Sequence, residues 1–406
     1  MRRTLAILIA RLASFASKLA GNAGTSLPGM WATKIDRHIL STLASEVSRG
    51  IIVVTGTNGK TTTANLIAAI LERAGFSVIS NKVGSNMYNG VVSTFLLHTP
   101  VVGRLQADYA VLEVDELYTV PVLAELNPTF FVITNLFPDQ ADRFGSVEEV
   151  RQALVRALSA TNPTQTKLVL NRDNPESARI AEMVLHSVVL YSTQAHAGYY
   201  ATDIADDDGL SFVAHTPPQE TPISTTIHGR YNVSNIMAAI ATVSEAGIVL
   251  QHCVDALASF EPLAGRMEQF ALNGKAITLN MTKNPAGFNR TLEAAAAGVE
   301  PYDMLIVVNN TPADGEETDW YQEIAFEQYS DNAPHTFYVS GTCAQQMAQR
   351  LHEAGINPSC ISVSENPHES LTAALGGSSR RLFILANYSA VFPQRKELKS
   401  RLPEER

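Results

Sequence analysis

One glycine-rich stretch, TGTNGKTTT at residues 55–63, carries the residue types best suited to holding a phosphate. Gly56 and Gly59 let the backbone turn tightly and present N–H groups to an anion, and a following helix adds the positive end of its dipole. Lys60 can place a cation on the β- and γ-phosphates, and the Thr61 hydroxyl can ligate Mg²⁺. The stretch therefore predicts a loop for a nucleoside triphosphate. The alternative is a glycine turn that holds no ligand.

The loop departs at one position from the usual P-loop pattern, G-x-x-x-x-G-K-[ST], because Val54 stands where the first glycine is expected. The physical argument is unchanged, since it depends on the two later glycines, the lysine and the helix. The residues expected to bind the nucleotide here are Gly56, Thr57, Asn58, Gly59, Lys60, Thr61 and Thr62.

The elements around the loop have the pattern of an α/β domain. The runs IIVVT, FSVIS, YAVLEV, TFFVIT and KLVLN are short, almost continuously apolar and bounded by polar or turn residues, as buried parallel strands are. Between them, residues 61–74 and 147–159 repeat apolar positions with helical spacing. Residues 195–227 mix turn residues with short alternating runs, which predicts antiparallel hairpins appended to a mostly parallel sheet with helices on both faces.

A second α/β unit is expected from about residue 260, since DMLIVV, HTFYVS, CISVS and RLFILA read as four more buried strands with helices such as 343–353 between them. We therefore predict a helical segment at 1–48 that packs on a central P-loop domain at 49–259. A C-terminal Rossmann-like domain at 260–406 follows.

The first residues, MRRTLAILIARLASFASKLAG, faintly resemble a secretory signal, but Arg11 interrupts the apolar run after about six residues. Apolar residues recur with helical spacing at Leu5, Leu8, Leu12, Phe15 and Leu19. The interpretation is an amphipathic helix packed on the core, and the alternative is a weak contact with a membrane surface. No apolar run reaches the roughly 18 residues of a membrane span.

Composition excludes several classes of protein. The net charge is −10 and no basic run is present, which argues against nucleic acid as a partner. The three cysteines, Cys253, Cys343 and Cys360, form no C-x-x-C pair, so neither a disulfide framework nor a zinc site is supported. A reducing cytoplasm fits this usage, and Cys253 and Cys343 are interpreted as structural.

TGTNGKTTT also resembles the ATP loop of the Mur ligase superfamily, whose members join an amine to a carboxylate through an acyl phosphate. In ADYAVLEVDE, Glu113 ends a predicted buried strand. In the superfamily a glutamate there holds Mg²⁺ together with the loop threonine, here Thr61. A helix cap or a surface acid is the alternative for Glu113. Asp115 and Glu116 could be solvated.

Further segments of the chain extend the resemblance. FFVITNLFPDQADRFG is similar to a superfamily segment through Thr134, Asn135, Asp139, Asp142, Arg143 and Gly145. Gln140 replaces a histidine that usually helps to bind a second metal, which leaves that site open. No lysine lies between Arg143 and Lys167, so the carbamylated lysine of the amino-acid-adding Mur ligases has no counterpart.

The resemblance also implies contacts to the rest of the nucleotide. GRYNVSNIMAA places Asn232 and Asn235 near the base, with helix capping as the alternative. Arg266 in PLAGRMEQF would reach the ribose and phosphates. Lys283 in NMTKNPAGFN would approach the γ-phosphate from the second domain, unless it is simply a solvated lysine.

Segments near the C-terminus, including NNTPADGEETDW and ANYSAVFPQR, resemble one branch, MurT, the ligase subunit of lipid II isoglutaminyl synthase. The branch implies ATP with Mg²⁺, and amidation of the α-carboxylate of D-glutamate in the lipid II stem peptide to D-isoglutamine. Lys60, Glu113 and Lys283 would be catalytic. The four-cysteine zinc ribbon of many branch members has no counterpart, so no zinc is expected.

No catalytic Cys–His pairing is readable in the sequence, so the resemblance implies a separate glutaminase subunit, GatD, as the partner. Asp314 is the candidate to complete the catalytic residues of GatD, and an Asp-Gly turn is the alternative. The lipid-linked substrate would bring a cytoplasmic protein to the inner face of the membrane. The competing functions are a stand-alone Mur or folylpolyglutamate-type amino-acid ligase and a non-catalytic ATP-binding scaffold or switch.

Overall fold

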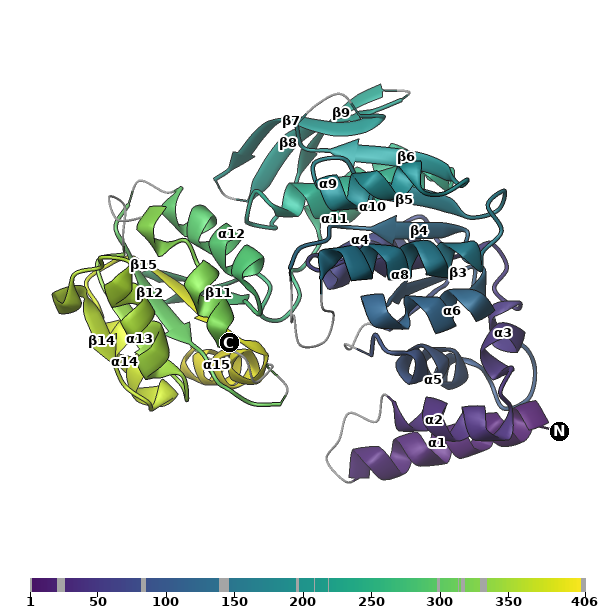
Figure 1. Cartoon of the computed structure of the whole chain (residues 1–406), viewed down its shortest axis with the longest axis horizontal. Coiled ribbons are helices and arrows are strands. Elements are labelled where there is room, and N and C mark those ends of the chain that lie inside the picture. The colour runs from purple at the N-terminus through teal and green to yellow at the C-terminus, as the bar shows by residue number, and fades with distance from the viewer. Residues whose placement is uncertain are drawn as a thin grey trace. The chain divides into compact units, whose positions relative to one another are not determined.

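The computed structural model describes residues 2–19, 26–81, 85–138, 146–194, 197–207, 209–217, 219–297, 300–312, 314, 318–328 and 334–402. The chain divides into two compact units (Figure 1). Unit 1 comprises Met1–Thr226 and Arg230–Phe260, and unit 2 comprises Ile227–Gly229 and Glu261–Arg406.

The described strands of unit 1 form a nine-stranded sheet in the order β2-β3-β1-β4-β5-β6-β7-β8-β9. Neighbouring strands are parallel from β2 to β7, and β7, β8 and β9 are antiparallel. This confirms the predicted fold class with its appended hairpins, and adds β6, which was not predicted. The strands are β1 (Gly50–Thr55), β2 (Val78–Ser80), β3 (Tyr109–Glu113), β4 (Phe130–Ile133), β5 (Lys167–Asn171), β6 (Ser187–Ser192), β7 (Tyr199–Asp206), β8 (Leu210–Thr216) and β9 (Gln219–Ser224).

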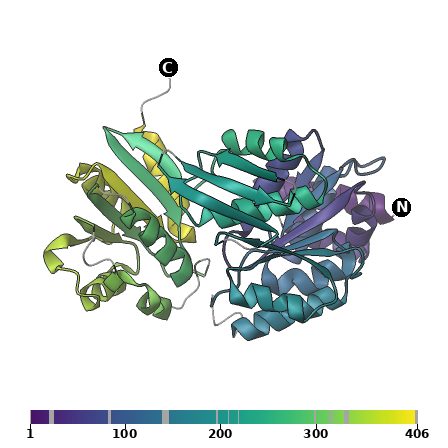
Figure 2. The same ribbon diagram turned by 90° about the horizontal axis from the view of Figure 1, so that it is seen from above.

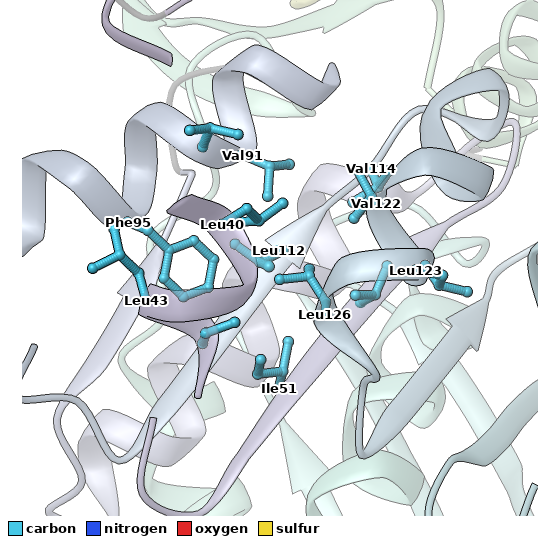
Figure 3. Packing of buried hydrophobic residues seen from close by; sticks show 14 of the residues in the cluster. Leu40, Leu43, Ile51, Val91, Phe95, Leu112, Val114, Val122, Leu123 and Leu126 are labelled. Atoms are coloured by element: carbon cyan, nitrogen blue, oxygen red, sulfur yellow. The ribbon is translucent and has the colours of Figure 1, made fainter. Parts of the chain in front are cut away.

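Helices lie on both faces of this sheet, as the alternation of buried residues along its strands requires. Ile51 lies in one core with residues of α3, α5 and α6 (Figure 3). Val53 and residues of α8 belong to the same core, whereas Ile52 and Val54 are buried outside it. Helix α4 packs against α10 and α11. The helices are α1 (Arg2–Leu19), α2 (Leu27–Ile35), α3 (Ile39–Ala44), α4 (Lys60–Arg73), α5 (Tyr88–His98), η1 (Glu116–Tyr118), α6 (Thr119–Leu126), α8 (Val147–Ser159), α9 (Pro175–Ala178), η2 (Arg179–Glu182), α10 (Asn232–Glu245) and α11 (Leu250–Ala258).

Helix α1 packs on unit 1 as predicted, but through the opposite face. Its buried residues are mostly small, namely Ala6, Ile7, Ala10, Ser14 and Ser17. The large residues whose spacing suggested the helix, Leu5, Leu8, Leu12 and Phe15, are exposed. Because α1 lies against α2 and α5, small side chains allow the close approach of helix backbones that packing there requires. Among the described helices, none has the length and apolarity needed to cross a membrane.

The described strands of unit 2 form a six-stranded sheet in the order β10-β11-β15-β12-β13-β14, with β10 antiparallel to β11 and the other pairs parallel. Figure 2 shows the ribbon of this unit from above. All four strands predicted in this unit are present. The elements are β10 (Glu268–Leu272), β11 (Lys275–Met281), α12 (Pro285–Ala296), β12 (Tyr302–Val307), η3 (Asp319–Glu323), β13 (Phe337–Ser340), α13 (Ala344–Glu353), η5 (Pro358–Cys360), β14 (Ile361–Val363), α14 (Pro367–Gly376), β15 (Arg381–Ala386) and α15 (Tyr388–Arg401).

The cysteines give a test of these cores. Cys253 and Cys343 are buried and Cys360 is half-buried, and burial raises the pKa of the Cys253 thiol to about 12. At mildly alkaline pH we expect a maleimide to modify Cys360 in the native protein and to spare Cys253, because the thiolate is the reactive form. Peptide mass mapping would locate the label, and urea should expose all three thiols. Native labelling of Cys253 at the rate of Cys360 would contradict the packing of α11.

Candidate functional site

The glycine-rich loop joins β1 to α4 at the carboxyl end of the sheet, where ligand sites form in α/β proteins. Gly56 has φ 123° and Gly59 has φ 85°, a region that favours glycine. A Cβ atom at Gly56 would lie 2.3 Å from Oγ1 of Thr134, and one at Gly59 would lie 2.1 Å from Oδ1 of Asn235. Neither position can therefore hold a side chain without displacing its neighbour.

The segment after β4 braces the loop. The backbone N–H of Thr57 donates to the carbonyl oxygen of Asn135 at 2.8 Å. The side-chain amide of Asn135 pairs with the backbone of Asn58, accepting from its N–H and donating to its carbonyl oxygen at 3.0 Å each. The Thr134 hydroxyl also donates to the Asn58 carbonyl oxygen at 2.7 Å. These bonds explain why Thr134 and Asn135 accompany the loop in the sequence.

The bracing also engages two N–H groups of the loop. The N–H groups of Thr57 and Asn58 already have acceptors on Asn135, so in this structure they are not directed at a phosphate. The N–H groups of the first turn of α4 have no partner within a helix by geometry. Donors for a phosphate would therefore come from the residues around Lys60, at the positive end of the α4 dipole.

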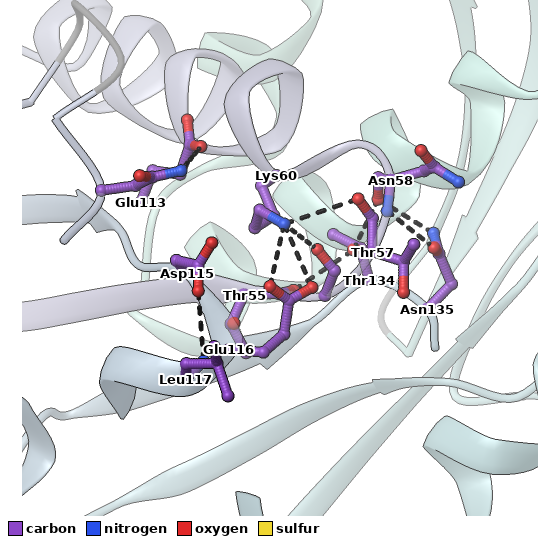
Figure 4. Close-up of polar contacts among 12 residues, drawn as sticks. Thr55, Thr57, Asn58, Lys60, Glu113, Asp115, Glu116, Leu117, Thr134 and Asn135 are labelled. Carbon is purple, nitrogen blue, oxygen red and sulfur yellow. Dashed lines mark hydrogen bonds and ion pairs between the residues drawn. The ribbon is translucent and has the colours of Figure 1, made fainter. Parts of the chain in front are cut away.

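Lys60 forms a buried ion pair with Glu116 (Figure 4). Its Nζ donates to Oε1 and Oε2 of Glu116 at 3.1 and 3.2 Å, and to the carbonyl oxygens of Gly56 at 2.5 Å and Thr57 at 3.4 Å. The exposed fractions are 8% for Lys60 and 5% for Glu116. Burial alone would lower the pKa of Lys60, but the carboxylates of Glu116, Glu113 and Asp115 outweigh it and raise that pKa above its ordinary value. The ammonium is therefore charged and fully engaged.

Glu116 and Asp115 are both buried, so the expectation that they could be solvated is wrong. The reason is the strand order, because β3 lies directly beside β1 and the residues after it return beneath the loop. Asp115 caps η1 by accepting from the N–H of Leu117 at 3.2 Å. Glu116 is thus a site residue that the sequence argument undervalued. The signal available was its position three residues beyond Glu113 at the end of a central strand.

Glu113 lies where predicted, at the end of β3 and opposite Val54 in the parallel register with β1. It is buried, and its Oε1 accepts from Nδ2 of Asn86 at 3.1 Å. It neither caps a helix nor lies on the surface. Its orientation by Asn86 and its charge beside Lys60 place it in the same site as the loop.

Thr61 and Glu113 suit Mg²⁺ by the chemistry of their donors. A hydroxyl and a carboxylate are hard oxygen ligands, and Mg²⁺ in nucleotide sites usually takes one or two protein ligands and completes its shell with water and phosphate. No group of three or more His, Cys, Asp or Glu side chains that could hold a metal occurs among the described residues. A magnesium ion shared with a nucleotide needs no such group, so the residues fit.

Asn232 and Asn235 lie on the first turn of α10, in the same unit as the loop. Both are buried, and Nδ2 of Asn235 donates to Oδ1 of Asn232 at 2.8 Å. The residue at the N-cap position is Tyr231, so neither asparagine is the N-cap. The contact between Asn235 and Gly59 brings α10 against the loop.

Arg266 and Lys283 belong to unit 2. The backbone N–H of Met281 donates to the carbonyl oxygen of Gly265 at 2.8 Å, so the segments carrying the two cations lie side by side. Lys283 follows β11, and Asn284 caps α12 by accepting from the N–H of Gly287. Both cations thus belong to one region of unit 2, and their approach to the loop of unit 1 is part of the proposal below.

Asp314 also lies in unit 2, in the segment after β12. Its Oδ1 accepts from the N–H of Ser389 at 2.9 Å, in the first turn of α15, and its Oδ2 accepts from the Thr311 hydroxyl at 2.5 Å. The carboxylate is held from both sides and is half-buried. It therefore has a structural role at the N-terminus of α15, whatever else it does.

Other predicted residues cannot be placed. Asp139, Gln140, Asp142, Arg143 and Gly145 lie outside the described residues, and the second metal site that depends on Gln140 stays open.

Comparisons with known proteins agree with this geometry. The model of the Mur ligase middle domain matches residues 54–243, and that of the MurT ligase C-terminal domain matches residues 281–391. The MurF ligase from Thermotoga maritima, solved in complex with ADP, has a TM-score of 0.73 at 16% identity, covering 91% of this chain and 85% of its own. In sequence the chain is thus similar to the models of two Mur ligase domains, and in fold it is similar to a Mur ligase.

Two curated relatives match this chain over almost its full length. The chain is 29% identical to the lipid II isoglutaminyl synthase (glutamine-hydrolyzing) subunit MurT of Staphylococcus aureus, over 98% of both chains. It is 28% identical to the subunit of that name from Streptococcus pneumoniae, over 99% of this chain and 98% of the relative. The full-length similarity of this chain is therefore to MurT subunits.

Because Glu116 pairs with Lys60, replacing Glu116 should lower the stability of the protein and raise its affinity for ATP. Glu116→Gln leaves a buried ammonium without its hydrogen-bonded counter-ion and should lower the free energy of unfolding by about 3 kcal/mol or more. It should also strengthen binding of magnesium-free ATP about tenfold, because the phosphates no longer displace a carboxylate from Lys60. Urea unfolding and calorimetric titration in EDTA measure the two effects.

Asp115→Asn is the matched control. The carboxylate of Asp115 also raises the pKa of Lys60, but only through its charge. The carboxylate of Glu116 raises that pKa through its charge and through a hydrogen bond to the Lys60 ammonium. A smaller gain in ATP affinity is expected for this variant. If both variants gained the same ATP affinity, the effect of Glu116 would be one of net charge alone. If Glu116→Gln bound ATP more weakly than the wild type, Glu116 would not compete with the phosphates for Lys60.

Proposed function

We propose that the protein is the ATP-dependent ligase subunit of a lipid II isoglutaminyl synthase. It would convert the α-carboxylate of D-glutamate in the lipid II stem peptide into the amide of D-isoglutamine, a step of peptidoglycan biosynthesis. The observation that carries the proposal is the combination of an organised triphosphate loop with full-length similarity to MurT subunits.

The chemistry follows from the poor reactivity of a carboxylate. One carboxylate oxygen attacks the γ-phosphorus of ATP, ADP leaves, and an acyl phosphate forms. Ammonia then attacks the acyl carbon, phosphate leaves with the C–O bond electrons, and the nitrogen loses a proton. The protein contributes positioning and neutralisation of the phosphate charge.

Within unit 1, Lys60 is the cation nearest to the β- and γ-phosphates in this proposal. When the nucleotide binds, Lys60 would release the Glu116 carboxylate and contact phosphate oxygens instead. Because Glu116 lies just after β3, nucleotide binding would then rearrange the end of that strand. Thr61 and Glu113 would hold Mg²⁺, which supplies further neutralisation of the phosphates when bound. Asn232 and Asn235 would lie on the side of the nucleotide base.

Unit 2 would complete the site by domain closure. Lys283 and Arg266 lie on adjacent segments, so a single movement of unit 2 would bring both toward the triphosphate. Lys283 would face the γ-phosphate and Arg266 the ribose and phosphates. Closure also excludes water, which would otherwise hydrolyse the acyl phosphate.

Ammonia would come from a glutaminase subunit of the GatD type. Cys253 and Cys343 are buried, so neither is placed to act as a nucleophile on glutamine. Asp314 would contribute its carboxylate to the catalytic residues of the partner. Its two hydrogen bonds fix the orientation of the carboxylate, and the neighbouring aromatic side chains Tyr388 and Phe392 are about half exposed at the start of α15. The complex would work in the cytoplasm at the inner face of the membrane.

The ammonia requirement gives the main test. With ATP, magnesium and lipid II, the purified chain should form the amide from ammonium chloride alone, and from glutamine only when the glutaminase subunit is added. Mass spectrometry of the stem peptide detects the product. Failure with both nitrogen donors would reject the function, and a product containing an added amino acid would instead favour the amino-acid ligase.

Within the same assay, Lys60→Ala should abolish turnover, at least about a thousandfold, because it removes the cation from the transferring phosphate. The double variant Lys60→Ala/Glu116→Ala controls for the carboxylate left unpaired. It should recover stability without recovering activity. Appreciable turnover by the folded double variant would show that the loop is not the catalytic site.

Asp314→Asn separates the charge of that residue from its structural role. An asparagine can still accept from Ser389 and donate to Thr311, so the N-terminus of α15 should stay intact. Glutamine-dependent amidation should fall about a hundredfold while ammonia-dependent amidation stays within about twofold. Asp319→Asn, an exposed acid on η3, is the charge-matched control. If amidation from glutamine and from ammonia fell equally in Asp314→Asn, the role of Asp314 would be structural only.

A further inference from the structure

The outward face of α1 is an apolar stripe without a covering element among the described residues. Leu5, Leu8, Leu12 and Phe15 are 43% to 67% exposed. With 3.6 residues per turn, these four positions fall within an arc of about 80° on the helix. They do not serve the fold, because α1 is attached to unit 1 through its opposite face.

Basic residues flank the stripe. On a helix of this pitch, Arg11 lies beside one edge of the apolar arc and Arg2 beyond the other, and both are exposed. The Arg11 guanidinium donates to the carbonyl oxygen of Thr99 at 2.9 Å, which ties α1 to the segment after α5. That segment exposes Val102.

The charge of this part of the chain is opposite to that of the rest. Residues 2–45 carry six arginine and lysine residues and one acidic residue, a net charge of +5, although the whole chain carries −10. On the adjacent helix α2, Trp31 is half exposed and Lys34 lies 4.8 Å above its ring. An apolar helix face with arginine and lysine at its borders, and tryptophan with lysine nearby, has the composition of a segment that lies in a bilayer interface.

We propose that α1 and α2 dock the protein on an anionic lipid bilayer, with Leu5, Leu8, Leu12 and Phe15 inserted among the lipids at the level of the headgroups. The basic residues would then contact the lipid phosphates. The purpose of docking rests on the proposed function, because a lipid-linked substrate is confined to a membrane surface. The docking itself rests only on the exposed stripe and its charge.

Charge complementarity favours the bilayer over a second copy of the chain. A symmetric contact through α1 would bring two segments of +5 together, whereas an anionic surface neutralises both. Helix α1 is not long and apolar enough to span a membrane and packs on unit 1 through its buried face, so it would lie in the plane of the interface.

Flotation with vesicles tests the docking without any substrate. The full chain should float with vesicles of phosphatidylcholine and phosphatidylglycerol, less with phosphatidylcholine alone, and less at high salt. Leu12→Gln/Phe15→Gln should weaken binding about tenfold or more, because both side chains would leave the lipid. Both are exposed in this structure, so the fold should be retained, which circular dichroism can check.

Met183→Gln/Leu185→Gln is the matched control, since it removes two exposed apolar side chains elsewhere on unit 1. It should bind vesicles like the wild type. Absence of vesicle binding by the wild type, or equal binding by Leu12→Gln/Phe15→Gln, would overturn the proposal. A stripe-dependent dimer in sedimentation, without vesicle binding, would assign the face to a second copy instead.

Activity on two forms of substrate separates this inference from the proposed function. With a short-chain, water-soluble lipid II analogue, Leu12→Gln/Phe15→Gln should retain wild-type turnover, and with lipid II in vesicles its turnover should fall. Vesicle binding without any amidation would reject the function and keep the docking. If Leu12→Gln/Phe15→Gln amidated the soluble and the vesicle-bound substrate as well as the wild type does, the docking would be rejected and the function kept.

Discussion

The site depends on one constraint, which is the burial of the Lys60 ammonium. A buried cation is costly unless a counter-charge and hydrogen-bond acceptors surround it. Glu116 supplies the charge, and the carbonyl oxygens of Gly56 and Thr57 supply acceptors. The acceptors require the left-handed backbone of the loop, and the counter-charge requires β3 beside β1. Loop conformation and strand order are therefore coupled through a single side chain.

Contacts within the chain organise the loop. Asn135 and Thr134 fix its backbone, and Glu116 occupies the cation that a phosphate would use. A preorganised loop lowers the entropy cost of binding, but the internal carboxylate competes with the phosphate. Binding is then an exchange of one anion for another, which favours ligands with enough negative charge to displace Glu116. A triphosphate satisfies this condition better than a neutral or singly charged ligand.

The sequence predicted the elements with strong local signals. Helix α8 has the predicted bounds because Ser146 and Glu149 form a capping box at its start, and the buried strands were legible as continuous apolar runs. Glu116 was undervalued because its burial depends on which strands are neighbours, and strand order cannot be read from local pattern. The packing face of α1 was misassigned for a related reason: its large apolar residues stand out in sequence, whereas contact with α2 and α5 requires the small ones.

The predicted functional residues occur in both units, and in each unit they lie where parallel sheets usually place ligand groups. Lys60 and Glu113 follow strands of unit 1, while Lys283 and Asp314 follow β11 and β12 of unit 2, so each group lies beyond the carboxyl ends of its own sheet. In the proposed reaction, a carboxylate activated at the loop would have to stay dry until ammonia arrives from the partner subunit. Under the proposed function, unit 2 would carry both the second set of cations and the carboxylate directed at the partner subunit. Helices α1 and α2 of the proposed membrane contact both belong to unit 1, so docking and ammonia delivery would involve different units of the chain.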